Sequence, residues 1–151
     1  IFKAAGENFY NLTFSGTGVK TFSSAVTASA NVLINAGASV YLNSPSNQLT
    51  IRGNYSNNGT VNTRTGTIAF TGAAAQTIGG TTITNFHNLT INNTSGGVSL
   101  LGPQNLINTL SLNNGLFSIN SQSFTMVSTA TMTARIAEIT GTGDITGNLT
   151  V

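Results

Sequence analysis

The stretch Leu89-Thr90-Ile91-Asn92 carries the pattern that decides the fold, an apolar residue followed by a small or polar one, twice over. Successive side chains of a β-strand point to opposite faces, so this order separates Leu89 and Ile91 from Thr90. Thr, Val, Ile and Phe, which favour strands, are frequent in the chain as a whole. We therefore predict a half-buried strand with Ile91 inward and Thr90 outward.

The same four-residue pattern recurs along the chain. Copies occupy positions 12–15, 32–35, 49–52, 68–71, 89–92, 110–113 and 124–127, and only the last position of the final copy, Val127, breaks the rule. The starts of most successive copies lie roughly 20 residues apart, a spacing typical of one solenoid coil. The steps from Val32 to Leu49 and from Leu110 to Phe124 are shorter, and weaker strand-like runs at 19–22, 40–42 and 116–119 lie between copies. We predict one shared core formed by Leu12, Ile34, Ile51, Phe70, Ile91, Leu112 and Met126.

The spacing of the copies distinguishes between two all-β architectures. An antiparallel sandwich usually spaces its strands about 8–12 residues apart, whereas a parallel β-solenoid returns to the same strand position once per coil of roughly 20 residues. No segment shows the periodicity of a capped helix. We predict an all-β fold, a right-handed parallel β-solenoid (β-helix) with coils of about 20 residues, right-handed because nearly all parallel crossovers are. Antiparallel β-sandwich repeats are the alternative.

The composition suits a stack of coils. Of 151 residues, five are Lys or Arg and three are Asp or Glu, so the formal net charge is +2. Thr, Asn, Gly and Ser together make up about half of the chain. Like charges stacked directly above one another repel, whereas Thr stacks well and Asn amides form ladders along the axis. The few scattered cations form no basic groove, so we expect no nucleic-acid partner.

A longer repeat is superimposed on the short one. Phe9-Tyr10-Asn11-Leu12-Thr13 returns in the second half of the chain as Phe86-His87-Asn88-Leu89-Thr90. We predict a single β-solenoid segment over residues 1–151, with two long repeats at about 9–85 and 86–151. Neither end shows a polar cap, so we expect the segment to belong to a longer chain or assembly and to continue or self-associate through its end strands. Apolar runs are too short for a membrane span in this segment.

Residues that carry out catalysis or hold metals are scarce. The acids are Glu7, Glu138 and Asp144, and the Gly-Thr-Gly turn between the last two gives no reason for them to converge as a glycosidase pair does. With no Cys and one His, the chain lacks ligands for zinc, and its three scattered acids do not suit calcium, which needs several oxygen ligands. His87 takes the place of Tyr10 in the long repeat and is interpreted as structural. We predict no catalytic, cofactor-binding or metal-binding residue, no cofactor and no enzymatic activity.

Two sets of residues would nevertheless suit a carbohydrate. Tyr10, Tyr41 and Tyr55 are candidates for exposed rings that stack on sugars, although buried or structural roles are favoured. A groove in which Arg52, Arg64 or Arg135 converged with a carboxylate would revive the idea of a polysaccharide lyase or hydrolase.

The segments Gly66-Thr67-Ile68-Ala69-Phe70-Thr71-Gly72 and Phe86-His87-Asn88-Leu89-Thr90-Ile91-Asn92-Asn93, with 53–60, 75–80, 133–137 and 145–151, resemble a known repeat class. It is found in very large surface and secreted proteins of Bacteroidota, many exported by the type IX secretion system. The resemblance spans about residues 9–151 and implies an extracellular or cell-surface location and adhesin-like or structural roles. Its motifs are structural and bring no catalytic residue.

Together these observations predict an extracellular structural or adhesive repeat segment of a bacterial surface protein, acting as a stalk, adhesin or matrix component. One alternative is a self-assembling filament subunit that stacks end to end. A polysaccharide-binding or polysaccharide-degrading β-helix protein is less favoured. Surface glycans are the candidate partners.

Overall fold

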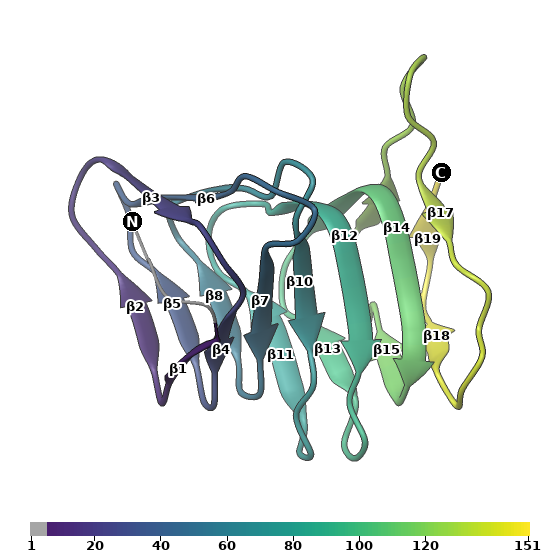
Figure 1. The fold of residues 1–151 in the computed structure, drawn as a ribbon. Helices are drawn as coiled ribbons and strands as arrows, with labels where there is room; N and C mark the ends of the chain where they lie inside the picture. The colour runs from purple at the N-terminus through teal and green to yellow at the C-terminus, as the bar shows by residue number, and fades with distance from the viewer. Residues whose placement is uncertain (1–5) are drawn as a thin grey trace.

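Residues 6–151 wind into seven stacked coils, seen edge-on in Figure 1. This computed structural model describes residues 6–151, and all of their regular secondary structure is β. Strands of neighbouring coils pair in parallel throughout the stack, as β10 (Thr67–Phe70) does with β7 (Gln48–Ile51) and β12 (Asn85–Asn92). The predicted parallel β-solenoid is therefore confirmed. The antiparallel sandwich is wrong.

The coils present three faces, which we call A, B and C in the order in which the chain visits them. Face A begins with β1 (Glu7–Phe9), β4 (Val26–Ala28), β7 and β10, and it ends with the second halves of β12 and β14 (Gln104–Asn114) and β17 (Arg135–Ile136). Face B consists of β2 (Leu12–Phe14), β5 (Val32–Ile34), β8 (Tyr55–Asn57), β11 (Gln76–Gly79), β13 (Val98–Leu100), β15 (Leu116–Ser118) and β18 (Asp144–Thr146).

Face C contains β3 (Val19–Phe22), β6 (Ser39–Leu42), β9 (Thr60–Asn62), the first halves of β12 and β14, β16 (Phe124–Met126) and β19 (Leu149–Thr150). Faces A and C form one 12-stranded sheet because β12 and β14 run across the corner between them. Their register shifts at that corner, where Phe86 pairs with Leu106 but Asn88 pairs with Thr109. This irregularity lies at the pocket described below.

The repeated sequence pattern marks three faces rather than one. Leu49, Ile68, Leu89 and Leu110 stack directly on one another in face A. Leu12 instead pairs with Val32 in face B, and Phe124 pairs with Gln104 in face C. The two shorter steps of the repeat, which begin at Val32 and at Leu110, therefore cover less than one coil and lead from one face to another.

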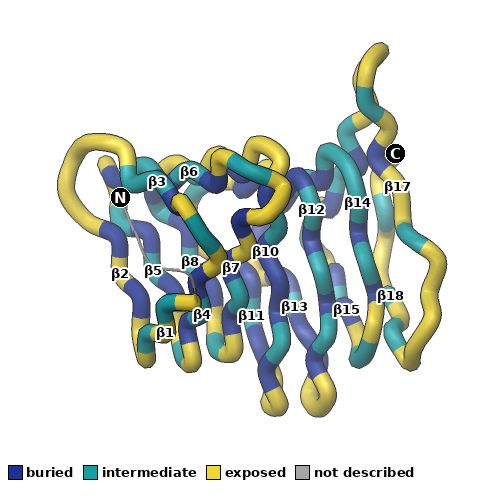
Figure 2. Tube along the Cα trace, in the orientation of Figure 1, coloured by how far each residue is buried: buried dark blue, intermediate teal, exposed yellow. Residues whose placement is uncertain are grey.

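One apolar core runs the length of the stack, and Figure 2 shows buried residues alternating with more exposed ones along the strands. All seven residues predicted to share it are buried in a single cluster, namely Leu12, Ile34, Ile51, Phe70, Ile91, Leu112 and Met126. Aromatic rings contact one another within it, as Tyr55 and Phe70 do edge-on with centroids 6.2 Å apart. The predicted alternation is confirmed in most copies, but in β10 the small residue Ala69, expected on the outer side, is also buried.

Asparagine side chains tie successive coils together at the corner between faces A and B. Asn11 Oδ1 accepts the backbone N–H of Asn31 at 3.1 Å, and Asn31 Oδ1 accepts that of Asn54 at 2.9 Å. Asn54 Oδ1 then accepts the N–H of Thr77, also at 2.9 Å. These bonds form the amide ladder expected from the composition. They satisfy corner N–H groups without using any charge.

Residues aligned by the long repeat occupy different surroundings. Leu12 lies in face B and Leu89 in face A. Tyr10 is 76% exposed, whereas His87 is only 8% exposed. The interpretation of these two as equivalent positions is therefore wrong. The two long repeats stay a prediction from sequence, and the first residues of the segment, 1–5, lie outside the described part of the chain.

Candidate ligand-binding pocket

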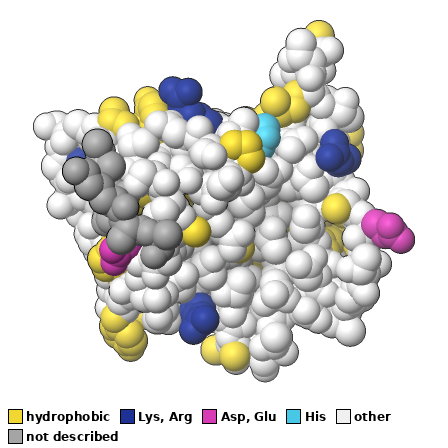
Figure 3. All heavy atoms as spheres, viewed as in Figure 1, with side chains coloured by type: hydrophobic (Ala, Val, Ile, Leu, Met, Phe, Trp, Pro, Cys, Tyr) yellow, Lys and Arg dark blue, Asp and Glu magenta, His cyan; other side chains and the backbone are white. Residues whose placement is uncertain are grey.

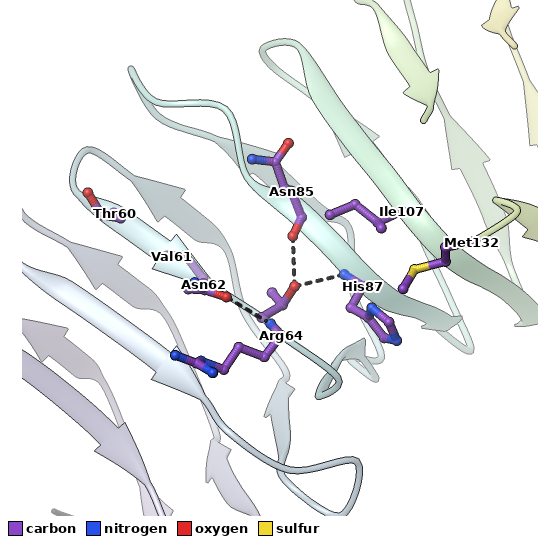
Figure 4. A pocket seen from close by; sticks show the side chains of 9 residues that line it. Thr60, Val61, Asn62, Arg64, Asn85, His87, Ile107 and Met132 are labelled. Carbon is purple, nitrogen blue, oxygen red and sulfur yellow. Dashed lines mark hydrogen bonds between the residues drawn. The ribbon is translucent and has the colours of Figure 1, made fainter. Parts of the chain in front are cut away.

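A pocket of about 500 Å³ opens on the outer side of face C, near its corner with face A. Three successive coils and one loop build it, and Figure 4 shows the side chains that line it. They are Thr60, Val61, Asn62, Thr63, Arg64, Asn85, His87, Ile107 and Met132. We call this the Arg64 pocket, after its one charged residue.

A tight turn after β9 positions Arg64. The turn closes where the N–H of Gly66 donates to the carbonyl of Thr63 at 2.6 Å. Asn62 Oδ1 accepts the N–H of Arg64 at 3.1 Å, which holds Arg64 at a φ of 45°. The guanidinium then lies over the ring of Tyr41, with Cζ 5.4 Å from the ring centroid, within the range of a cation–π contact.

Thr63 fastens this turn to the next coil. Its hydroxyl donates to the carbonyl of Asn85 at 2.7 Å and accepts the backbone N–H of His87 at 2.8 Å, and Figure 4 shows these two bonds as the dashed lines that end on Asn85 and His87. The side chain is buried, so both bonds are shielded from water. They hold β12 at the point where its register with β14 shifts. Irregularities of this kind re-aim side chains and are common beside functional sites.

His87 is mostly buried in the wall of the pocket. Burial lowers the pKa of its imidazole below the ordinary value of 6.5. The ring is therefore neutral at pH 7, with one nitrogen as a donor and the other as an acceptor. A neutral ring adds hydrogen-bonding capacity to the pocket without adding charge.

The loop 127–134 supplies the last wall and projects from the stack at the upper right of Figure 1. Val127 N–H still bonds Leu106 O at 2.7 Å, and Thr129 N–H then bonds Met132 O at 2.7 Å to close a short antiparallel bridge. The loop lengthens its coil, because the chain from Leu110 to its partner Ile136 is longer than the chain from Leu89 to its partner Leu110. Sequence reasoning missed it. The one sequence feature that could have indicated this loop is Val127, an apolar residue where the repeated pattern has a polar one.

The acids and arginines singled out in the sequence do not converge in the described residues. Glu138 and Asp144 are both exposed, and Asp144 Oδ1 accepts only the neighbouring N–H of Ile145, at 2.7 Å. Arg52 follows β7 and Arg135 lies in β17, so only Arg64 reaches the pocket, which no carboxylate lines. Figure 3 likewise shows charged side chains few and separated on this side of the molecule.

The three tyrosines differ in exposure. Tyr10 is exposed, as expected of a candidate ring, and Tyr41 is half-buried beneath Arg64. The candidacy of Tyr55 as an exposed ring is wrong, because it is 1% exposed and fills the core between Phe70 and Phe86. Tyr55 pairs with the buried Ile78 on the neighbouring strand, so its side chain points to the same, inner side of the sheet.

The pocket offers several kinds of group that can contact a ligand. It combines one cation, a neutral imidazole, amides, hydroxyls and the apolar side chains of Ile107 and Met132, whereas the Val61 side chain packs against the core. Within residues 6–151, no group of three or more His, Cys, Asp or Glu side chains is placed to hold a metal ion. The same residues form no helix with the length and hydrophobicity needed to cross a membrane.

Comparison with known proteins finds no relative, because no family model, no curated protein and no solved structure matches the chain. Its function has to be inferred from its residues and their geometry.

Proposed function

We propose that the chain is an extracellular structural or adhesive segment of a bacterial surface protein, a stalk, adhesin module or matrix component. The observation that carries this proposal is the uninterrupted stack of seven coils with its polar ladder and single apolar core. Coils about 4.8 Å apart form a rod about 29 Å long. Each coil contacts only its neighbours, so length is added by repetition and the rod acts as a spacer.

The way the stack is held together suits an exposed location. The chain contains no Cys and few ionisable groups, so its stability depends on apolar burial and uncharged hydrogen bonds. Such bonds respond little to salt or redox conditions. Several buried polar side chains bond backbone groups of other coils, as Asn47 Nδ2 donates to Phe22 O at 2.7 Å. These features support a location outside the cell, where salt and redox conditions vary.

The pocket supports a binding or structural role over a degradative one. Hydrolysis of a glycosidic bond needs two carboxylates on either side of the bond. No carboxylate lines the Arg64 pocket, and His87 is the only titratable group there besides Arg64. An adhesin module needs only the contacts that the pocket offers.

Surface labelling tests this proposal directly. Antibodies raised against the purified chain would be applied to intact cells of the source bacterium, with and without protease treatment, and to permeabilised cells. We expect antigen on intact cells or in the medium, and its loss after proteolysis. A cytoplasmic protein serves as the control for cell integrity. Antigen found only after permeabilisation would show that the extracellular role is wrong.

A filament subunit is a second candidate, favoured by the last described coil. Ile136 and Ile139 are exposed by 36% and 46%, and Ile145 and Leu149 are only partly buried. Strands β17, β18 and β19 each have one strand partner among the described residues. A second copy docking there would extend the parallel sheets and cover these apolar side chains.

A further inference from the structure

We infer that the Arg64 pocket binds a carboxylate-bearing sugar unit, a pyranose of the uronic or sialic acid class within a glycan. This inference goes beyond the proposed function and does not depend on it. The binding can be measured on the purified chain wherever the protein is located.

The backbone of Arg64 has a positive φ of 45°, a conformation that favours glycine or asparagine over arginine. Arg64 and Asn120 are the two non-glycine residues with positive φ in the described part of the chain. Asparagine tolerates this region because its side chain bonds locally, whereas arginine has no such compensation. Nothing blocks glycine or asparagine from position 64, which is exposed. Strain that persists at one residue points to a function for its side chain.

The guanidinium of Arg64 is held in place but has no counter-ion in the described part of the chain. The Tyr41 ring supports it from one side. Among residues 6–151, none of the acids Glu7, Glu138 and Asp144 forms an ion pair with it. Lys20 differs, because its Nζ donates to three backbone carbonyls in its own loop. A positioned guanidinium presents paired N–H donors that match the two oxygens of a carboxylate.

Around this cation the pocket offers what a sugar ring needs. Asn62 and Asn85 use their side-chain oxygens inside the protein, accepting from Arg64 N and Asn105 Nδ2, so their amide N–H groups are what remains for a ligand. Thr60 and the neutral His87 add hydroxyl and imidazole groups for sugar hydroxyls. Ile107 and Met132 form an apolar wall suited to the C–H face of a pyranose.

The size and charge of the pocket limit the ligand further. About 500 Å³ lies within the usual range of small-molecule sites, roughly 300–1,000 Å³. A polyphosphate or nucleic acid requires several cations, and this pocket has one. A simple anion such as acetate would leave the apolar wall and the amides unused. A glycan with one acidic unit offers a carboxylate to the guanidinium over Tyr41, and hydroxyls and C–H faces to the amides and the apolar wall on the neighbouring coils.

Calorimetric titration of the purified chain tests the ligand class. The probes are trigalacturonic acid against its fully methyl-esterified form, and 3′-sialyllactose against lactose, with acetate as the anion-only control. We expect at least one acid to bind and its uncharged partner to bind at least tenfold more weakly. Which acid binds distinguishes a uronate source from a sialylated one. Equal binding of the uncharged sugars, binding of acetate as tight as that of the acids, or no binding of either acid would overturn the inference.

Matched arginine variants test the site. Arg64→Asn removes the guanidinium and suits the positive φ, so we expect unchanged or higher thermal stability with at least a tenfold loss of affinity for the acid. Arg52→Asn removes the guanidinium of another exposed arginine, beyond face A, and should bind like the parent chain. Arg64→Gly provides the same test should Arg64→Asn fold poorly. Retained affinity in the folded Arg64 variants, or equal loss in Arg52→Asn, would place the ligand elsewhere.

Discussion

The hydroxyls of Tyr55 and Thr84, which lie far apart in the chain, share a hydrogen bond of 3.0 Å inside the core. Thr84 Oγ1 also accepts from Asn57 Nδ2 at 3.1 Å, and Thr84 N–H donates to Gln104 Oε1 at 2.9 Å. This small polar network links coils that are otherwise joined by apolar packing and ladder bonds. Every member is satisfied, so the network favours this stacking register over a shifted one.

The network makes stability sensitive to high pH through Tyr55. Burial raises the pKa of its phenol far above the ordinary 10.0. The unfolded chain releases this proton near pH 10 while the folded chain retains it, so stability is full below pH 10 and falls as the pH rises above it. We expect Tyr55→Phe to cost about 1 kcal/mol at pH 7 through the lost hydrogen bond but to flatten the alkaline decline. Urea unfolding between about pH 8 and pH 11 measures both effects. Equal alkaline slopes in the two proteins would contradict this account.

The alternation of β12 predicts opposite outcomes at adjacent residues. Ile91 is fully buried, and Thr90 is half-buried on the outer side of face A. Ile91→Asp would place an unpaired carboxylate in the core, at a cost of several kcal/mol that we expect to unfold the chain. Thr90→Asp should change the free energy of unfolding by less than about 1 kcal/mol. Circular dichroism during heating compares the two, and similar damage from both would show that the facing of this strand is misassigned.

The strands were predictable from sequence because one face of each is buried. Apolar residues alternate with small or polar ones at residues 49–52, 68–71 and 89–92, because every second side chain of a strand faces the core. The assignment to faces was not predictable in the same way, since all three faces carry the same alternation. Leu12 and Leu89 therefore align in sequence although they belong to different faces. A local pattern records burial but not position around the coil.

The pocket depends on features that leave little trace in sequence. Arg64 acquires its place through a positive φ in a turn, and no residue preference for arginine marks such a turn. Met132 arrives on a loop whose one sequence signal is the failed alternation at Val127. Thr63 and His87 meet through a side-chain bond between successive coils. Contacts of this kind follow from the winding of the coils and could be recognised only once it was known.

His87 makes stability depend on pH on the acid side, within a range where the other groups should contribute little. The few ionisable groups predict a melting temperature that varies little between about pH 5 and 9. Burial lowers the pKa of His87 below 6.5, so the unfolded chain takes up a proton first, and stability falls as the pH drops below 6.5. We expect a shallow decline there that His87→Gln, which stays uncharged, removes. Scanning calorimetry from about pH 5 to pH 8 measures it, and a decline that persists unchanged in His87→Gln would assign it to another group.

The corner ladder predicts that an exposed asparagine contributes to stability. Asn54 Oδ1 accepts the N–H of Thr77, and Asn54→Ala would leave that N–H to water. We expect a loss of about 0.5–1.5 kcal/mol in the free energy of unfolding. Asn43 is also exposed and lies outside the ladder, so Asn43→Ala should change the free energy of unfolding by less than about 0.5 kcal/mol. Chemical denaturation of both variants is the measurement, and equal effects would mean that the ladder bond contributes nothing.

Glu7 is expected to limit self-association at β1, which has one strand partner, β4, among residues 6–151. Glu7 occupies the inward column of face A, in register with Val26, Leu49, Ile68, Leu89 and Leu110. Another strand pairing with β1 would bury its carboxylate without a partner, which natural sheets use to discourage edge pairing. Glu7→Val would complete the apolar column, so we expect it to associate at concentrations at least tenfold below those the parent chain requires. Asn8→Val, on the outward side of the same strand, controls for added hydrophobicity. Sedimentation velocity over a wide concentration range decides between them, and equal association of both variants would show that the inward charge does not protect this edge.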